Sequence, residues 1–234
     1  MKRGVWHGKM KERGDGFAEG VCAMKLIFVR HGKDDERFRG GWSEQDLTAE
    51  GIKQAKQLAV HIRENAGEYG IVHILASDLP RTVTTAECVA EALGMEIRTE
   101  QRIREINNGE LAGMPNETAR ERYPGLFFSA LGMDESYPGG ESPRAFFLRI
   151  KEWFWEFCAA CRGGEGNILI VTHGGVINVI YHLVKGIAWS NQNRAFQAAN
   201  CSIHILNVED MEFEVENRTD FLSARAEDFQ VQES

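Results

Sequence analysis

Cysteine is scarce in this chain, and its distribution argues against a disulfide framework. The 234 residues include five cysteines, an odd and widely scattered set: Cys22, Cys88, Cys158, Cys161 and Cys201. This pattern is typical of a reducing compartment, so we expect a cytoplasmic protein. Cys158 and Cys161 form a C-x-x-C inside a helical pattern without a second pair nearby, which favours ordinary packing over metal or redox chemistry.

Long apolar runs and an excess of positive charge are also lacking. No stretch approaches the roughly 20 apolar residues of a membrane helix, and residues 1–23 lack the apolar centre of a signal peptide. The chain has 27 Lys and Arg against 35 Asp and Glu, so its formal net charge is −8. We therefore expect no nucleic-acid and no membrane partner, because both require a basic face. A local cluster of Arg and His can still bind a small anion.

Two apolar segments each end at a histidine that is followed by glycine. Residues 26–32 have the sequence Leu-Ile-Phe-Val-Arg-His-Gly, and residues 168–175 have the sequence Ile-Leu-Ile-Val-Thr-His-Gly-Gly. Each pattern predicts a buried strand that ends at its histidine. Because ligands bind beyond the carboxyl ends of the strands of an open parallel sheet, we expect His31 and His173 to lie close together.

Strands and helices alternate along the rest of the chain. Helices are predicted to begin after the N-caps Thr48, Ser77 and Ser142, and a further helix is predicted over residues 176–184. Strands are predicted over residues 71–76, 95–98 and 102–106, and a closing hairpin over residues 201–215. This alternation predicts an α/β fold: a three-layer helix–sheet–helix sandwich with a mostly parallel central sheet.

One domain is expected over residues 24–216. Hydrophobic residues make up 43% of the chain, which is enough for one sizeable core. Residues 1–23 are expected to be a disordered leader or to precede the natural start at Met24, and residues 217–234 to be a poorly packed polar tail. Residues 107–141 show no clear period, and we interpret them as a lid or substrate loop.

Polar side chains follow several of the predicted strands. Arg30 precedes His31 directly, and Arg81 lies at the start of the helix that follows the second strand, where both a guanidinium and a helix N-terminus favour a phosphate. Glu105 lies near the end of the predicted strand 102–106. Taken singly, each of these residues has an ordinary structural explanation: His31 as a histidine at the end of a strand, and the charged side chains as members of surface ion pairs. Together they predict a phosphate site, in which the neighbouring cations keep His31 neutral and nucleophilic.

In this order the motifs resemble those of the histidine phosphatase superfamily, also called phosphoglycerate-mutase-like, from about residue 25 to residue 208. The resemblance depends on Arg30-His31-Gly32, Ser77-Asp78-Leu79-Pro80-Arg81, Glu105 followed by Gly109 and Gly113, and Thr172-His173-Gly174. The segments 47–51 and 139–142 also look like features of that family.

The resemblance implies a mechanism and a set of roles. His31 would attack phosphorus and become a phosphohistidine, while Glu105 would donate and later accept a proton. Arg30, Arg81 and His173 would surround the phosphoryl oxygens of a small phosphorylated substrate. Neither a metal nor a cofactor is implied, because the Arg and His cluster supplies the positive charge.

The chain departs from the family pattern after Arg-His-Gly. Many members continue with Glu or Gln, then Thr or Ser, and three residues later an Asn that contacts the phosphate. Here Asp34 stands in place of the hydroxyl residue and Arg37 in place of the Asn. Arg37 or Arg39 either substitutes for that contact or is solvated. Arg37 and Gly174 are therefore additional candidates for the pocket.

Three activities remain open, and hydrolysis of a phosphomonoester is favoured. The mutases resembled here have the acid motif Glu-Arg-His-Tyr-Gly, whereas residues 105–109 of this chain are Glu-Ile-Asn-Asn-Gly, which removes contacts for a second acidic group. A non-catalytic module that binds a phosphorylated ligand or protein would have no need of Glu105. The aromatic residues of the segment 107–141 either fold that loop or face an apolar, ring-bearing leaving group.

Overall fold

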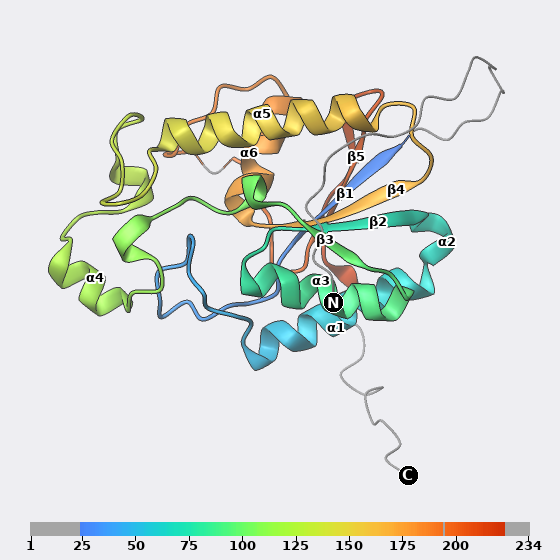
Figure 1. Cartoon of the computed structure of the whole chain (residues 1–234), viewed down its shortest axis with the longest axis horizontal. Coiled ribbons are helices and arrows are strands. Elements are labelled where there is room, and N and C mark those ends of the chain that lie inside the picture. The colour runs from blue at the N-terminus through green and yellow to red at the C-terminus, as the bar shows by residue number, and fades with distance from the viewer. Residues whose placement is uncertain (1–23, 194, 223–234) are drawn as a thin grey trace, which may run out of the picture.

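The computed structural model describes residues 24–193 and 195–222, so the leader expected over residues 1–23 lies outside the described residues. Figure 1 shows a central sheet covered by helices on both faces. The helices are α1 (Ala49–Glu64), α2 (Ala66–Tyr69), α3 (Pro80–Leu93), α4 (Asn116–Arg122), α5 (Pro143–Cys161) and α6 (Gly174–Val184). The strands are β1 (Lys25–Arg30), β2 (Ile71–Ala76), β3 (Ile97–Thr99), β4 (Asn167–Thr172), β5 (Ile203–Asn207) and β6 (Glu212–Arg218).

The sheet has the strand order β3-β2-β4-β1-β5-β6. The first four strands are parallel to one another, whereas β5 is antiparallel to β1 and β6 is antiparallel to β5. The predicted α/β sandwich with a mostly parallel sheet is therefore confirmed. In the β1–β4 pair, Arg30 is opposite Thr172, so the two following residues, His31 and His173, emerge at the same edge.

Alternate residues of the central strands face opposite layers, as the pleat of a strand requires. Ile27 and Val29 of β1 pack with Leu58 of α1 in the layer that also contains α3. Leu26 and Phe28 pack against the opposite layer, which α5 and α6 build with the buried side chains Phe146, Trp153, Phe154, Ile177 and Ile180. Each fully buried side chain of this size contributes roughly 1.5–3 kcal/mol, and this two-sided core holds the strand ends in place.

Two of the three predicted N-caps are confirmed, and the third is wrong. The Thr48 side chain accepts a hydrogen bond from the backbone N–H of Gly51, and the Ser142 side chain accepts one from Ala145. Helix α3 begins at Pro80 after the N-cap residue Leu79, not at Ser77. The reason is that the Ser77 N–H donates to the carbonyl of Val171 at 2.9 Å, which keeps Ser77 in line with β2 beside β4.

The predicted strand over residues 102–106 is absent. Residues Gln101–Ile103 form a turn of 3₁₀ helix, and Glu105 lies in irregular chain after it. Side chains satisfy the carbonyls here in place of a strand partner: Thr172 Oγ1 donates to the carbonyl of Ile103 at 2.8 Å, and Arg149 Nη1 donates to the carbonyl of Arg102 at 2.8 Å. Such bonds are an alternative to a sheet ladder.

The expected tail boundary at residue 217 falls inside a strand. β6 continues to Arg218, and a 3₁₀ turn follows over Asp220–Leu222. The Phe221 ring stacks on His61 of α1 with a centroid distance of 4.5 Å, so an apolar contact anchors this segment. The expectation of a poorly packed tail is therefore wrong for residues 217–222, and residues 223–234 lie outside the described part.

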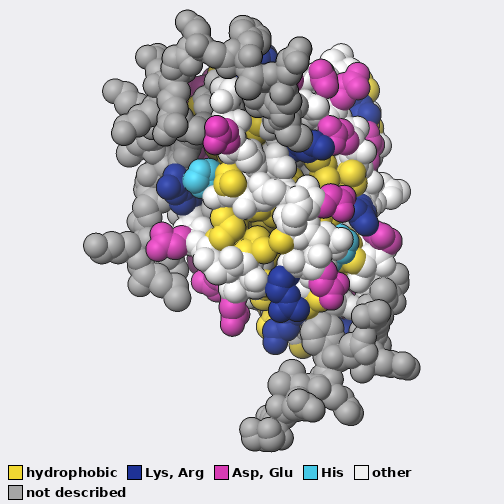
Figure 2. Space-filling view, turned by 90° about the vertical axis from the view of Figure 1, so that its right-hand side faces the viewer, with side chains coloured by type: hydrophobic (Ala, Val, Ile, Leu, Met, Phe, Trp, Pro, Cys, Tyr) yellow, Lys and Arg dark blue, Asp and Glu magenta, His cyan; other side chains and the backbone are white. Residues whose placement is uncertain are grey.

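Charged side chains of both signs are mixed on the face shown in Figure 2, and two of the thiols are buried. Figure 2 shows acidic and basic side chains interspersed around a group of hydrophobic ones on the face that it presents. No helix in the described ranges is both long and apolar enough to span a bilayer. Cys158 and Cys161 are free and buried in α5, and burial raises the pKa of each thiol to about 12, so both stay protonated at neutral pH.

We expect the close contact between the start of α1 and the chain after β1 to require glycine. A Cβ on Gly51 would lie 2.1 Å from the carbonyl oxygen of Lys33. Gly51→Ala should lower the free energy of unfolding by about 1–3 kcal/mol, measured by urea denaturation, although Ala favours helix. Gly67→Ala in α2 is the matched control, because a Cβ there meets open space. A Gly51→Ala protein as stable as wild type would contradict the packing described here.

Candidate active site

Two histidines and one arginine meet at the carboxyl ends of β1 and β4. His31 follows β1 and His173 follows β4; both are buried, and their ring centroids lie 5.2 Å apart. Arg81, in the first turn of α3, lies between them. Its Nε donates to His31 Nε2 at 3.4 Å, and its Nη2 is 3.2 Å from His173 Nδ1. The structure therefore brings together three residues that are far apart in sequence.

The surrounding backbone holds His31 in one orientation. Its Nδ1 is 2.7 Å from the carbonyl oxygen of Gly32, which can only accept, so Nδ1 carries the proton and Nε2 has the free electron pair. The Gly32 N–H donates to Thr85 Oγ1 at 3.0 Å, and Asn200 Nδ2 donates to the carbonyl of His31 at 3.1 Å. The unprotonated Nε2 thus faces Arg81.

Burial keeps both imidazoles neutral. Loss of hydration lowers the pKa of His31 well below its ordinary value, and the positive charges of Arg81 and Arg30 lower it further. The same burial, followed by the charge of Arg81, lowers the pKa of His173. A neutral imidazole is the form that can attack an electrophile, in agreement with the expectation for His31.

Arg30 and Gly174 complete the anion-binding end of the site. Arg30 Nη1 donates to the carbonyl of Ala198 at 2.7 Å, whereas its buried Nε has no hydrogen-bond partner among the described residues. A Cβ on Gly174 would lie 3.5 Å from that Nε, in ordinary van der Waals contact, so Gly174 lies directly beside the guanidinium. Arg30, His31, Arg81 and Gly174 all line one cavity. The guanidinium of Arg30 is therefore a candidate contact for an oxyanion bound there.

Glu105 reaches the same cavity from the irregular segment after β3. Its Oε2 accepts from the backbone N–H of Gly175 at 2.9 Å, at the N-terminus of α6, and its Oε1 accepts from Ile106 at 3.1 Å. A Cβ on Gly175 would lie 2.2 Å from Oε1, so any larger residue here would displace the Glu105 carboxylate. Sequence reasoning did not single out Gly175, although the second glycine after His173 was a visible signal.

Arg149, which sequence reasoning missed, holds Glu105 in position. Arg149 of α5 donates through Nη2 to the carbonyl of Glu105 at 3.2 Å and through Nη1 to the carbonyl of Arg104 at 3.0 Å. Arg149 also forms an ion pair with Glu141, whose Oε1 accepts from the N–H of Asn107 at 2.8 Å. The bonds from Arg149 to the carbonyls of Arg104 and Glu105, and from Asn107 to Glu141, join residues more than 30 positions apart, so no local motif predicts them.

Ser77 contacts His173, and two loop carbonyls hold Arg81. His173 Nε2 is 2.9 Å from Ser77 Oγ, which explains why Ser77 does not cap α3. Arg81 Nη2 donates to the carbonyl of Gly41 at 2.7 Å and Nη1 to the carbonyl of Ser43 at 3.3 Å. The guanidinium is thereby fixed with few degrees of freedom before any ligand binds.

Asp34 and Arg37, the two departures from the family pattern, lie in different environments: one in the cavity and the other in solvent. Asp34 lines the cavity, and its Oδ2 lies 3.6 Å from Arg81 Nε. Arg37 is held in solvent by a two-point ion pair with Asp35, at 2.9 and 2.5 Å, and its side chain is 85% exposed. The guanidinium of Arg39 lies over the Phe127 ring at 4.9 Å. Neither Arg37 nor Arg39 lines the cavity, so the proposed extra contact by Arg37 is wrong.

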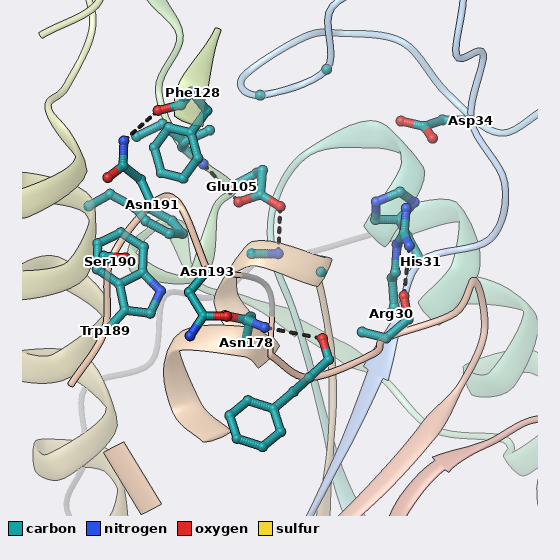
Figure 3. A pocket seen from close by; sticks show the side chains of 18 of the residues that line it. Arg30, His31, Asp34, Glu105, Phe128, Asn178, Trp189, Ser190, Asn191 and Asn193 are labelled. Atoms are coloured by element: carbon teal, nitrogen blue, oxygen red, sulfur yellow. Dashed lines mark hydrogen bonds between the residues drawn. The ribbon is translucent and has the colours of Figure 1, made fainter. Parts of the chain in front are cut away.

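The cavity has a volume of about 320 Å³ and two chemically different ends. Figure 3 shows His31 and Arg30 at one end and Trp189, Asn191 and Phe128 at the other, with Glu105 between them. A carboxyl group placed between a nucleophile and an open subsite is in the position to exchange a proton with a leaving atom.

An open α/β sheet with two histidines and two arginines near its carboxyl edge has the position and the positive charge that suit an anionic ligand. A family model described as "Histidine phosphatase superfamily (branch 1)" matches residues 26–220. The chain belongs to this superfamily, as the motifs predicted.

Relatives within the superfamily carry two kinds of names. The "Probable phosphoglycerate mutase GpmB" of Salmonella paratyphi B is 31% identical over 196 residues, which are 81% of this chain and 87% of that protein. The mycobacterial glucosyl-3-phosphoglycerate phosphatase in complex with inorganic phosphate has a TM-score of 0.67 at 25% identity, over 86% of this chain and 100% of that one. The alpha-ribazole phosphatase of Shigella flexneri has a TM-score of 0.70 at 21% identity, over 83% and 96%, and shows the shared fold.

We expect Arg149 to control the position of Glu105. Arg149→Met removes the donors to the carbonyls of Arg104 and Glu105, so kcat for a phosphomonoester should fall by about 10- to 100-fold, while the inhibition constant for vanadate at the His31 end should change little. Arg144→Met, on the same helix but exposed and paired with Asp134, is the matched control and should keep wild-type kcat. Equal losses in both variants would contradict this positioning role.

We expect the Asp34 carboxylate to weaken anion binding. It lies beside Arg81 in the cavity and opposes an incoming phosphate, so Asp34→Asn should lower the inhibition constant of inorganic phosphate by roughly three- to tenfold. The neighbouring Asp35→Asn, which disturbs only the exposed pair with Arg37, should leave that constant unchanged. Weaker phosphate inhibition in the Asp34 variant would show that the carboxylate supports binding instead.

Proposed function

We propose that this protein hydrolyses the phosphomonoester of a small metabolite through a phosphohistidine on His31. The observation that carries the proposal is the unprotonated His31 Nε2, which lies beside Arg81 in a cavity that also contains Arg30 and Glu105. This arrangement supplies a nucleophile, positive charge for the phosphoryl oxygens and a group for proton transfer.

The chemistry takes place in two displacements at phosphorus. His31 Nε2 forms a bond to phosphorus while the bond to the leaving oxygen breaks, and Glu105 gives its proton to that oxygen. Glu105 then takes a proton from water as the water oxygen attacks the phosphohistidine, which releases phosphate and restores neutral His31 and protonated Glu105. Arg30, Arg81 and His173 hold the phosphoryl oxygens in both steps.

Two observations favour hydrolysis without a metal. The superfamily contains structural neighbours named as phosphatases, including one solved with inorganic phosphate. The guanidiniums of Arg30 and Arg81 supply the charge that metal ions provide in other phosphoryl-transfer sites.

A mutase reaction is the second candidate, because the relative at 31% identity is named as a phosphoglycerate mutase. That reaction must hold a substrate with two acidic groups. Ile106, an aliphatic side chain, lines the cavity at the position where the mutase motif has arginine. This difference favours hydrolysis over mutase chemistry.

The test is phosphate release by the purified chain from 4-nitrophenyl phosphate and 3-phosphoglycerate, with EDTA present. We expect turnover in EDTA and an acid-labile phosphoenzyme in a quenched reaction. His31→Asn should lower kcat by about a thousandfold or more, and Glu105→Gln by roughly 10²- to 10⁴-fold. His73→Asn, on β2 and exposed, is the matched control and should leave kcat unchanged.

Three results would count against the proposal. Full activity of the His31→Asn enzyme would exclude the nucleophile. Loss of turnover in EDTA that returns with a divalent cation would exclude the metal-free mechanism. Formation of 2-phosphoglycerate in place of free phosphate would establish the mutase reaction.

A further inference from the structure

The end of the cavity beyond Glu105 is lined by aromatic rings from three separate segments. Phe128 comes from a 3₁₀ turn, Phe146 from α5, and Trp189 from the chain that follows α6. The Phe128 and Phe146 centroids are 6.2 Å apart, and the Phe146 and Trp189 centroids are 6.1 Å apart. Such a cluster is a favourable surface for a flat apolar group, because ring contacts add to the gain from burial.

Two asparagines that line the cavity hold these segments together. Asn191 Nδ2 donates to the carbonyls of Phe128 and Leu131 at 2.5 and 2.8 Å, and Asn178 Nδ2 donates to the carbonyl of Phe196 at 3.1 Å. Both residues line the cavity, and neither Oδ1 has a partner in the described part of the chain. A ligand hydroxyl or N–H can therefore donate to these oxygens.

Among the described lining residues, acidic and basic side chains occur only toward the other end of the cavity. They are Arg30, Asp34, Arg81 and Glu105, and all four belong to the phosphate end or its border. Figure 3 shows Trp189, Ser190, Asn191 and Phe128 on the far side of Glu105. A carboxylate or second phosphate placed there would lose its hydration without gaining a described counter-ion, which is costly.

We propose that the leaving group of the substrate is an uncharged, ring-bearing alcohol or phenol with hydrogen-bond donors. This inference rests on the proposed function, since it assigns the phosphoryl group to the His31 end. It also revises an expectation from the sequence. Of the aromatic residues of the segment 107–141, Phe128 lines the cavity, whereas Tyr123 donates to Glu110 and Phe127 lies under Arg39. The other rings lie outside that segment.

The test uses phosphonates, which bind but are not hydrolysed. By titration calorimetry, benzylphosphonate should bind about tenfold more tightly than methylphosphonate, because its ring enters the aromatic end. 3-Phosphonopropionate, which carries a carboxylate instead of a ring, should bind no more tightly than methylphosphonate. Trp189→Leu and Phe128→Leu should each remove most of the benzylphosphonate advantage and leave the methylphosphonate Kd unchanged. Trp155→Leu, a 40%-exposed tryptophan on α5, is the matched control and should keep the advantage.

The outcomes separate this inference from the proposed reaction. Tighter binding of 3-phosphonopropionate than of benzylphosphonate would overturn the uncharged leaving group. Equal binding of benzyl- and methylphosphonate by wild type would overturn the aromatic subsite, even if the enzyme hydrolyses phosphate esters. A preference for benzylphosphonate that depends on Trp189 would support the subsite, even if no ester were hydrolysed. Methylphosphonate binding and the unfolding temperature show whether each variant is folded.

Discussion

The parallel pairing of β1 with β4 is the constraint on which the active site depends. Their register places Arg30 opposite Thr172, and the ladder continues through the His31 N–H to the carbonyl of Thr172 at 3.0 Å. A shift of one residue would turn each side chain to the other face of the sheet. Because both strands are buried on both faces, their apolar packing resists such a shift, and the two imidazoles therefore meet.

Arg81 turns this meeting point into an anion site. Arg81 is 1% exposed, and this burial lowers the pKa of its guanidinium. The nearby carboxylates of Asp34 and Glu105 act in the opposite direction and raise that pKa. A guanidinium stays charged under these conditions, and the carbonyls of Gly41 and Ser43 replace part of its lost hydration. The positive charge of Arg81 in turn disfavours protonation of both histidines. The charge of Arg81 thus suits an oxyanion and adds to burial in keeping His31 and His173 neutral.

Glu105 depends on a different part of the structure. Because it lies in irregular chain, side-chain and backbone contacts set its position. The Gly175 N–H at the start of α6 donates to its carboxylate. Trp42 Nε1, at 2.7 Å, and the guanidinium of Arg149 donate to its backbone carbonyl. The proton-transfer group and the aromatic end of the cavity are therefore built by α5, α6 and the loops between layers. His31, His173 and Arg30 are positioned by the sheet itself, and Arg81 by the first turn of α3.

The sequence by itself determined the features that depend on neighbouring residues. Apolar runs that end at His31 and His173 predicted the paired strands, and Thr48 and Ser142 predicted helix starts, because periodicity and capping act within a few residues. Only the tertiary structure decided that Ser77 contacts His173, that Arg37 stays in solvent, that residues 102–106 form no strand, and that Arg149 and Trp189 belong to the site. In each case the residue's contact partner either lies far away in the sequence or is one of several local partners open to it. Which partner it contacts is therefore decided only when the layers pack together.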